Sequence, residues 1–147
     1  MNREVLQSDV SAGAERERAY PSGLTVRKIT MAEELLISRA GLSVLTLPFL
    51  SRIASEKATE EDVVEIAKAT FICCTPAEAT RATLRSGSDA LDAAFIAFLS
   101  AADRAEFAEA SAFVMKSVAE IAAAHFRIVS ESGGSVKNAP FPEGGRS

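Results

Sequence analysis

The chain has 147 residues, with 16 Lys and Arg against 20 Asp and Glu, and 48% of its residues are hydrophobic. This length suits one domain with its own core, but not two. The net charge of −4 disfavours a general nucleic-acid or anionic-membrane binder, because both need a basic surface. Its longest apolar stretches, at residues 42–50 and 71–74, are shorter than the roughly 18–20 residues that span a bilayer.

The first residues of the chain and its two cysteines indicate the cellular compartment in which the protein works. Residues 1–6 have mixed charge and no apolar segment of the kind that secretory signals carry. Cys73 and Cys74 are adjacent, and neighbouring residues of a helix point about 100° apart, so a disulfide between them would be badly strained. We therefore expect free thiols that pack as small hydrophobic side chains in a cytoplasmic protein.

The N-terminal end is predicted to be a flexible arm over residues 1–22, because its Ala, Glu, Arg and Ser show no apolar periodicity. A turn signal follows at residues 20–23. Residues 24–28 are rich in β-branched side chains and predict a short strand. The sequence shows no second strand, so two alternatives stay open: pairing with a second copy, or an extended segment lying on the helices.

Two helices begin with clear capping chemistry. Thr30-Met31-Ala32-Glu33 is a capping box that predicts a helix over residues 31–40. Thr59 is followed by three acids, which the helix dipole favours in a first turn, and predicts a helix over 60–74. Between these two helices, the apolar stretch interrupted by Pro48 predicts a shorter helical piece at about 48–55.

Three more helices follow. Thr75-Pro76-Ala77-Glu78 combines a capping box with proline at the first helical position and predicts a helix to about Arg85. Ser88 is predicted to cap a helix over about 89–99, and the last helix is predicted over about 102–130.

The composition then changes to Gly, Pro and Ser, so residues 132–147 are predicted to be a disordered tail. The prediction is an all-α, compact bundle of four to six helices over residues 23–131. It has a long C-terminal helix, a short N-terminal extended segment and disordered termini.

Few side chains of the chain suit catalysis. It has one His, two adjacent Cys, one Tyr and no Trp, and none of the common catalytic or phosphate-binding motifs. We therefore expect a binding protein with no catalytic residue, cofactor or metal. His125 falls on the apolar face of the last helix and is interpreted as a core residue. A metal site with the two cysteines is disfavoured, because zinc prefers four ligands and a C-x₂-C spacing.

Three apolar residues of the last helix are candidates for binding a partner. A helical wheel places Phe113 among glutamates rather than with the core, and Met115 and Phe126 together on the other flank. Their positions indicate more apolar coverage than one core face requires. We expect this helix to pack against a partner or a second copy.

An alternative interpretation treats residues 61–85 as a helix-turn-helix with Arg81 and Arg85 facing DNA. Between residues 24 and 130 the chain holds 11 Lys and Arg against 14 Asp and Glu, so two ordinary packed helices are favoured.

The order of these features resembles a known family. The extended Leu24-Thr25-Val26-Arg27 leads to the capped Thr30-Met31 helix and to Leu47-Pro48-Phe49-Leu50. After these come the helix at Thr59-Glu60-Glu61-Asp62-Val63, the Thr75-Pro76-Ala77-Glu78 turn and the break at Arg85-Ser86-Gly87-Ser88. A long Ala-rich helix and a Gly/Pro tail complete the order. Over about residues 20–147, this order is similar to the small helical tail assembly chaperones of long-tailed bacteriophages and prophages.

This resemblance implies a non-enzymatic protein of the bacterial cytoplasm that acts during tail morphogenesis. It would bind the long, helical, aggregation-prone tape measure protein and help to recruit tail tube subunits around it. The family offers no catalytic residues to transfer to this chain. Alternatives are a structural virion or head–tail connector component and, less favoured, a helix-turn-helix regulator. A homo-oligomer is also possible.

Overall fold

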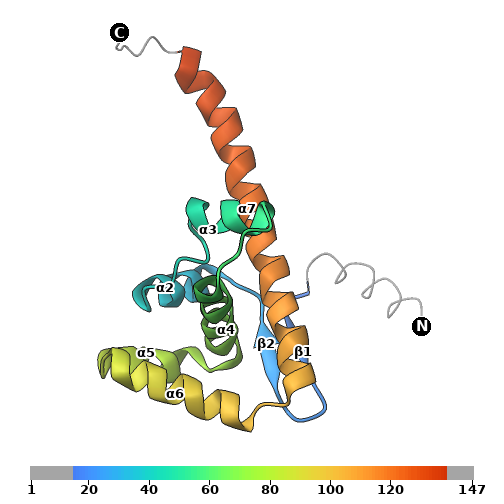
Figure 1. The fold of residues 1–147 in the computed structure, drawn as a ribbon. Coiled ribbons are helices and arrows are strands. Elements are labelled where there is room, and N and C mark those ends of the chain that lie inside the picture. The colour runs from blue at the N-terminus through green and yellow to red at the C-terminus, as the bar shows by residue number, and fades with distance from the viewer. Residues whose placement is uncertain (1–14, 139–147) are drawn as a thin grey trace, which may run out of the picture.

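The computed structural model describes the backbone of residues 15–138 and the side chains of residues 15–125. The described part is mostly helical, which confirms the predicted fold class, and six helices follow a small two-stranded sheet (Figure 1). The elements in chain order are β1 (Glu17–Ala19), β2 (Thr25–Arg27), α2 (Met31–Arg39), α3 (Leu47–Ala54), α4 (Glu60–Cys74), α5 (Ala77–Arg85), α6 (Ser88–Ala101) and α7 (Arg104–Asn138).

Helix α4 occupies the centre of the molecule (Figure 1) and contacts α2, α6, α7 and strand β2. Its second half is apolar on nearly all sides, so Phe71, Ile72 and Cys73 are all buried. Phe71 also packs against the rings of Phe95 and Phe98 on α6, with centroids 5.7 and 5.2 Å away. An all-round apolar helix must be enclosed by its neighbours, which explains its central place.

The predicted strand exists, but its partner was missed. β2 pairs antiparallel with β1, with Arg18 opposite Val26, so the loose arm expected over residues 1–22 contains a strand at Glu17–Ala19. The turn at residues 20–23 joins the two strands, with Gly23 at a positive φ of 100°. All three residues of β1 are exposed, so the strand has no apolar alternation to reveal it. The remainder of the predicted arm, residues 1–14, lies outside the described residues.

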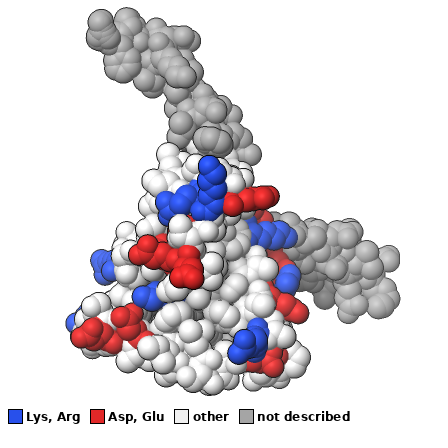
Figure 2. Space-filling view, viewed as in Figure 1, with Lys and Arg blue, Asp and Glu red and all other residues white. Residues whose placement is uncertain are grey.

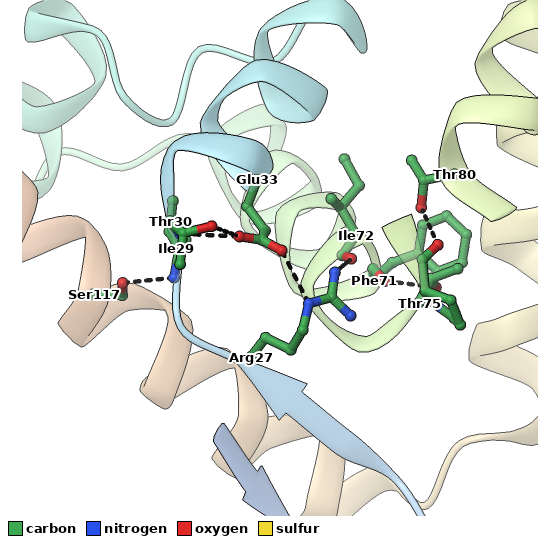
Figure 3. Close-up of polar contacts among 10 residues, drawn as sticks. Arg27, Ile29, Thr30, Glu33, Phe71, Ile72, Thr75, Thr80 and Ser117 are labelled. Carbon is green, nitrogen blue, oxygen red and sulfur yellow. Dashed lines mark hydrogen bonds and ion pairs between the residues drawn. The ribbon is translucent and has the colours of Figure 1, made fainter. Parts of the chain in front are cut away.

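The hairpin is fixed to the helices by polar contacts (Figure 3). Arg27 on β2 donates from Nε to Glu33 on α2 at 2.9 Å and from Nη2 to the carbonyl oxygen of Ile72 on α4 at 3.0 Å. The amide of Ile29 donates to the hydroxyl of Ser117 on α7 at 2.9 Å. One short segment of chain is thus tied to three helices.

Two of the four predicted caps form. The amide of Thr30 donates to Glu33 at 2.9 Å, and Thr59 and Asp62 exchange the two bonds of a capping box. The predicted box at Thr75 is wrong, because α5 begins one residue later, with Pro76 as its N-cap. Thr75 instead ends α4, and its hydroxyl donates to the carbonyl oxygen of Phe71 at 2.7 Å. Ser88 is not a cap either, since Gly87, at a positive φ of 109°, precedes it as the N-cap of α6.

Helix α7 is longer than predicted. It continues to Asn138 through Gly133-Gly134, where the sequence predicted a disordered tail from residue 132. Each glycine costs a helix about 1 kcal/mol relative to alanine, but extending an existing helix avoids the cost of nucleation. The last part of α7 therefore extends beyond the body of the molecule (Figure 1). Residues 139–147 of the predicted tail lie outside the described residues.

On the face seen in Figure 2, positive and negative side chains lie in small mixed groups, with uncharged surface between the groups. That face has no continuous basic stripe of the kind that tracks a nucleic-acid backbone. Within residues 15–138, none of the helices has both the length and the apolar character needed to cross a membrane.

Candidate partner-binding site

Phe113, one of the three predicted binding residues, is not on the surface. It is 8% exposed and belongs to the hydrophobic core with Tyr20 and Val26 of the hairpin region. The guanidinium carbon of Arg18 on β1 lies 5.1 Å from the centre of its ring, a cation–π geometry. The prediction was wrong because the hairpin that covers this flank of α7 was not foreseen.

Met115 lies where the sequence placed it, on the opposite flank of α7. It is half-buried and faces a groove of about 740 Å³ between α3 and α7. The groove is lined by residues of both helices and of the turn before α3: Leu45, Leu47, Leu50, Ser51, Ile53, Ala54, Met115, Val118, Ala119, Ile121, Ala122 and His125. We call this the α3/α7 groove.

The shape of the α3/α7 groove follows from the two helices that form it. Pro48 lies in the first turn of α3, where its missing N–H costs nothing. Phe49 is fully buried and anchors α3, while Leu47 stays 72% exposed on the rim. On α7 the lining runs from Met115 to His125, about 15 Å along the helix axis. That length matches two to three turns of a second helix.

The salt bridge between α3 and α4 holds the wall of the α3/α7 groove in place. Arg52 donates from Nε and Nη2 to the two oxygens of Asp62, at 2.8 and 2.7 Å. Such a two-point pair fixes geometry as well as charge. The hydrogen bonds from Arg52, followed by that from the amide of Thr59, hold the pKa of Asp62 well below its usual range.

His125 differs from its prediction. It was interpreted as a core residue, but the structure shows it exposed, at the end of the α3/α7 groove where α7 leaves the body. The helical periodicity was right, because Val114 and Val118 on the same face are buried. His125 lies one helical turn beyond the half-buried Ile121, at the last described position of this face, and its side chain is exposed.

Phe126, the third predicted binding residue, lies on the part of α7 whose side chains are outside the described residues. Of the three candidates, the structure therefore buries Phe113 and places Met115 in the α3/α7 groove. Sequence reasoning missed Leu47 and Leu50 as groove residues, although the apolar stretch around Pro48 was the available signal.

The cysteines are free and pack as predicted. Cys73 is fully buried in the core and Cys74 is half-buried against it. Burial raises the pKa of Cys73 to about 12 and the pKa of Cys74 to about 11. At neutral pH both remain thiols, which are poor nucleophiles.

Arg81 and Arg85, the residues of the helix-turn-helix interpretation, are exposed on α5. They line a separate hollow together with Arg39 of α2 and Leu84. The sequence gave no reason to associate Arg39 with them, because 42 positions separate Arg39 from Arg81.

Comparisons of this chain with protein-family models, with curated proteins and with solved structures found no match.

Proposed function

We propose that this protein binds an amphipathic helix of another protein in the α3/α7 groove and acts as a tail assembly chaperone of a long-tailed bacteriophage or prophage. The observation that carries the proposal is the groove itself, an open apolar channel between two helices. Apolar grooves of this kind accept the apolar face of a partner helix through anchors at positions i, i+3 or i+4 and i+7. Those anchors span about 11 Å, within the length of the groove.

The partner that we propose is the tape measure protein, as the resemblance in the order of sequence features implies. A long helical protein with apolar stripes aggregates unless its stripes are covered. The α3/α7 groove would cover about three turns of such a stripe at a time, and tail tube subunits would then replace the chaperone. In this role the protein works in the bacterial cytoplasm and is absent from the finished particle.

The experiment is capture of a phage tape measure protein by the tagged full-length chain when the two are co-expressed. Ala119 is exposed on α7 and lines the groove, so Ala119→Glu introduces a charge there without disturbing the core. We expect capture to fall about tenfold, because a desolvated charge in an apolar contact costs more than 1.4 kcal/mol. The matched control is Ala112→Glu, on an exposed position of α7 outside the groove, which should capture normally.

A second pair of variants tests the opposite wall. Leu47→Ser removes an exposed apolar side chain from the groove, and Ile96→Ser removes one of similar exposure (62%) from α6. Only Leu47→Ser should weaken capture. Equal capture by all four variants would contradict the proposed site, and stoichiometric recovery of the protein from purified particles would favour the alternative, a structural virion component.

A further inference from the structure

A second site lies on α2 and α5, away from the α3/α7 groove. Arg39 ends α2, and Arg81 and Arg85 lie one turn apart on α5. Together with Leu84 they line a hollow of about 360 Å³. The helices that carry them are packed against each other, so three positive charges converge on one small volume.

These arginines differ from the ion-paired arginines in the described part of the chain. Arg27 is paired with Glu33 and Arg52 with Asp62, each at less than 3 Å. Among the described residues, no carboxylate lies within 4.0 Å of Arg39, Arg81 or Arg85. In a chain with a net charge of −4, a cluster of three arginines without acidic partners is unexpected.

Helix dipoles explain only part of the cluster. Arg39 and Arg85 occupy the last turns of their helices, where a positive charge is favourable. Arg81 is one turn earlier and gains little from the dipole, and its charge repels that of Arg85 four residues away. Arg81 therefore needs another explanation.

We infer that this hollow binds a small phosphate-type anion with at least two negative charges. Guanidinium groups bind phosphoryl oxygens through two parallel hydrogen bonds, and several guanidinium groups around one ligand also neutralise its charge. Leu84 is the fourth residue that lines the hollow. The arginines line one local hollow of about 360 Å³, so the site suits a compact anion better than the continuous backbone of DNA.

The experiment titrates the isotope-labelled full-length chain with inorganic pyrophosphate at physiological ionic strength. NMR follows the Nε–H signals of the arginines. The signals of Arg39, Arg81 and Arg85 should move together. Arg81→Gln should weaken binding about tenfold, because a charge-assisted hydrogen bond is lost. Arg81→Lys, which keeps the charge but loses the planar fork, should lie between Arg81→Gln and the unmodified chain.

Arg104→Gln is the matched control, because Arg104 is exposed on α7 and lies outside the hollow. It removes the same charge and should leave pyrophosphate binding unchanged. Titration with adenosine diphosphate distinguishes two sources of the same chemistry: tighter binding than pyrophosphate identifies a nucleotide, and equal binding identifies the free anion.

Three results would overturn the inference. They are no movement of the three signals, an equal loss of binding in Arg104→Gln, and tighter binding of a short DNA duplex than of pyrophosphate. None of the four residues of the hollow lines the α3/α7 groove, so these results leave the proposed function untouched.

Discussion

The two flanks of α7 carry similar apolar side chains, but one flank is covered by the rest of the chain and the other is left open. On one flank the β1–β2 hairpin covers Phe113, and the backbone and hydroxyl of Ser22 donate hydrogen bonds to Glu106 at its edge. On the other flank α3 approaches Met115 but leaves the α3/α7 groove open. An apolar position on a helix thus indicates that something covers it, but not whether the cover comes from the same chain or from a partner.

The largest expected effect is on the covered flank. Phe113→Ala removes a buried ring and should lower the free energy of unfolding by about 3 kcal/mol. Met115→Ala, on the half-buried open flank, should cost less than half as much. Urea denaturation followed by circular dichroism measures both. Equal losses would show that the two flanks are not covered differently.

The hairpin depends on its link to α2 and α4, so Arg27→Ala should be the next most costly change. It leaves the carboxylate of Glu33, which is 5% exposed, without its ion pair, and it frees the carbonyl oxygen of Ile72. We expect a loss of about 2 kcal/mol. Amide exchange should also become faster in β2 than in α3. Uniform protection in the variant would contradict the anchoring role of Arg27.

Acid should destabilise the packing on both flanks of α7, because each flank depends on a carboxylate whose pKa is lowered in the folded protein. Burial alone would raise the pKa of Glu33, but hydrogen bonds from Thr30 and Arg27 outweigh it and the net pKa is lowered. Hydrogen bonds from Arg52 and from the amide of Thr59 lower the pKa of Asp62.

A carboxylate with a lower pKa in the folded state stabilises the protein above its unfolded-state pKa, about 4, and that stabilisation is lost as the pH falls through the folded-state value. The melting temperature should therefore fall below about pH 4. It should fall less steeply in Asp62→Asn, which has no proton to gain at that position. Parallel profiles for the two proteins would argue against a stabilising role of Asp62.

The smallest expected effect is on the rim of the open flank. Leu47→Ser should change the free energy of unfolding by no more than about 0.5 kcal/mol, because the side chain is 72% exposed. Thermal denaturation provides the measurement, with Ile96→Ser as the matched surface control. A loss above 1.5 kcal/mol would mean that Leu47 stabilises the fold rather than lining an open site.

The helices could be predicted because their signals are local. The capping boxes at Thr30 and Thr59, the break at Ser86-Gly87 and the 3.6-residue periodicity of α7 act within a few neighbouring residues. The box expected at Thr75 failed because Thr75 ends α4 and Pro76 takes the N-cap position of α5, and the sequence does not show which of two neighbouring residues holds that position.

The candidate site was predicted only in part. The position of Met115 was predicted correctly, because a helical wheel separates the two flanks of α7 from its core face. Phe113 was misplaced because its cover, β1, has only exposed residues and no periodic pattern of its own. His125 was misplaced because periodicity continues along α7 after the body of the protein has ended.

By itself, the sequence determined the helical class, the approximate starts of the helices and the free, packed thiols of Cys73 and Cys74, since each depends on backbone propensity, capping or hydrophobicity within a short segment. Only the tertiary structure decided which apolar face is covered, which side of α7 remains open and that Arg39 lies beside Arg81. Those properties depend on contacts between residues tens of positions apart in the sequence. Local sequence patterns do not show which of these distant residues come into contact.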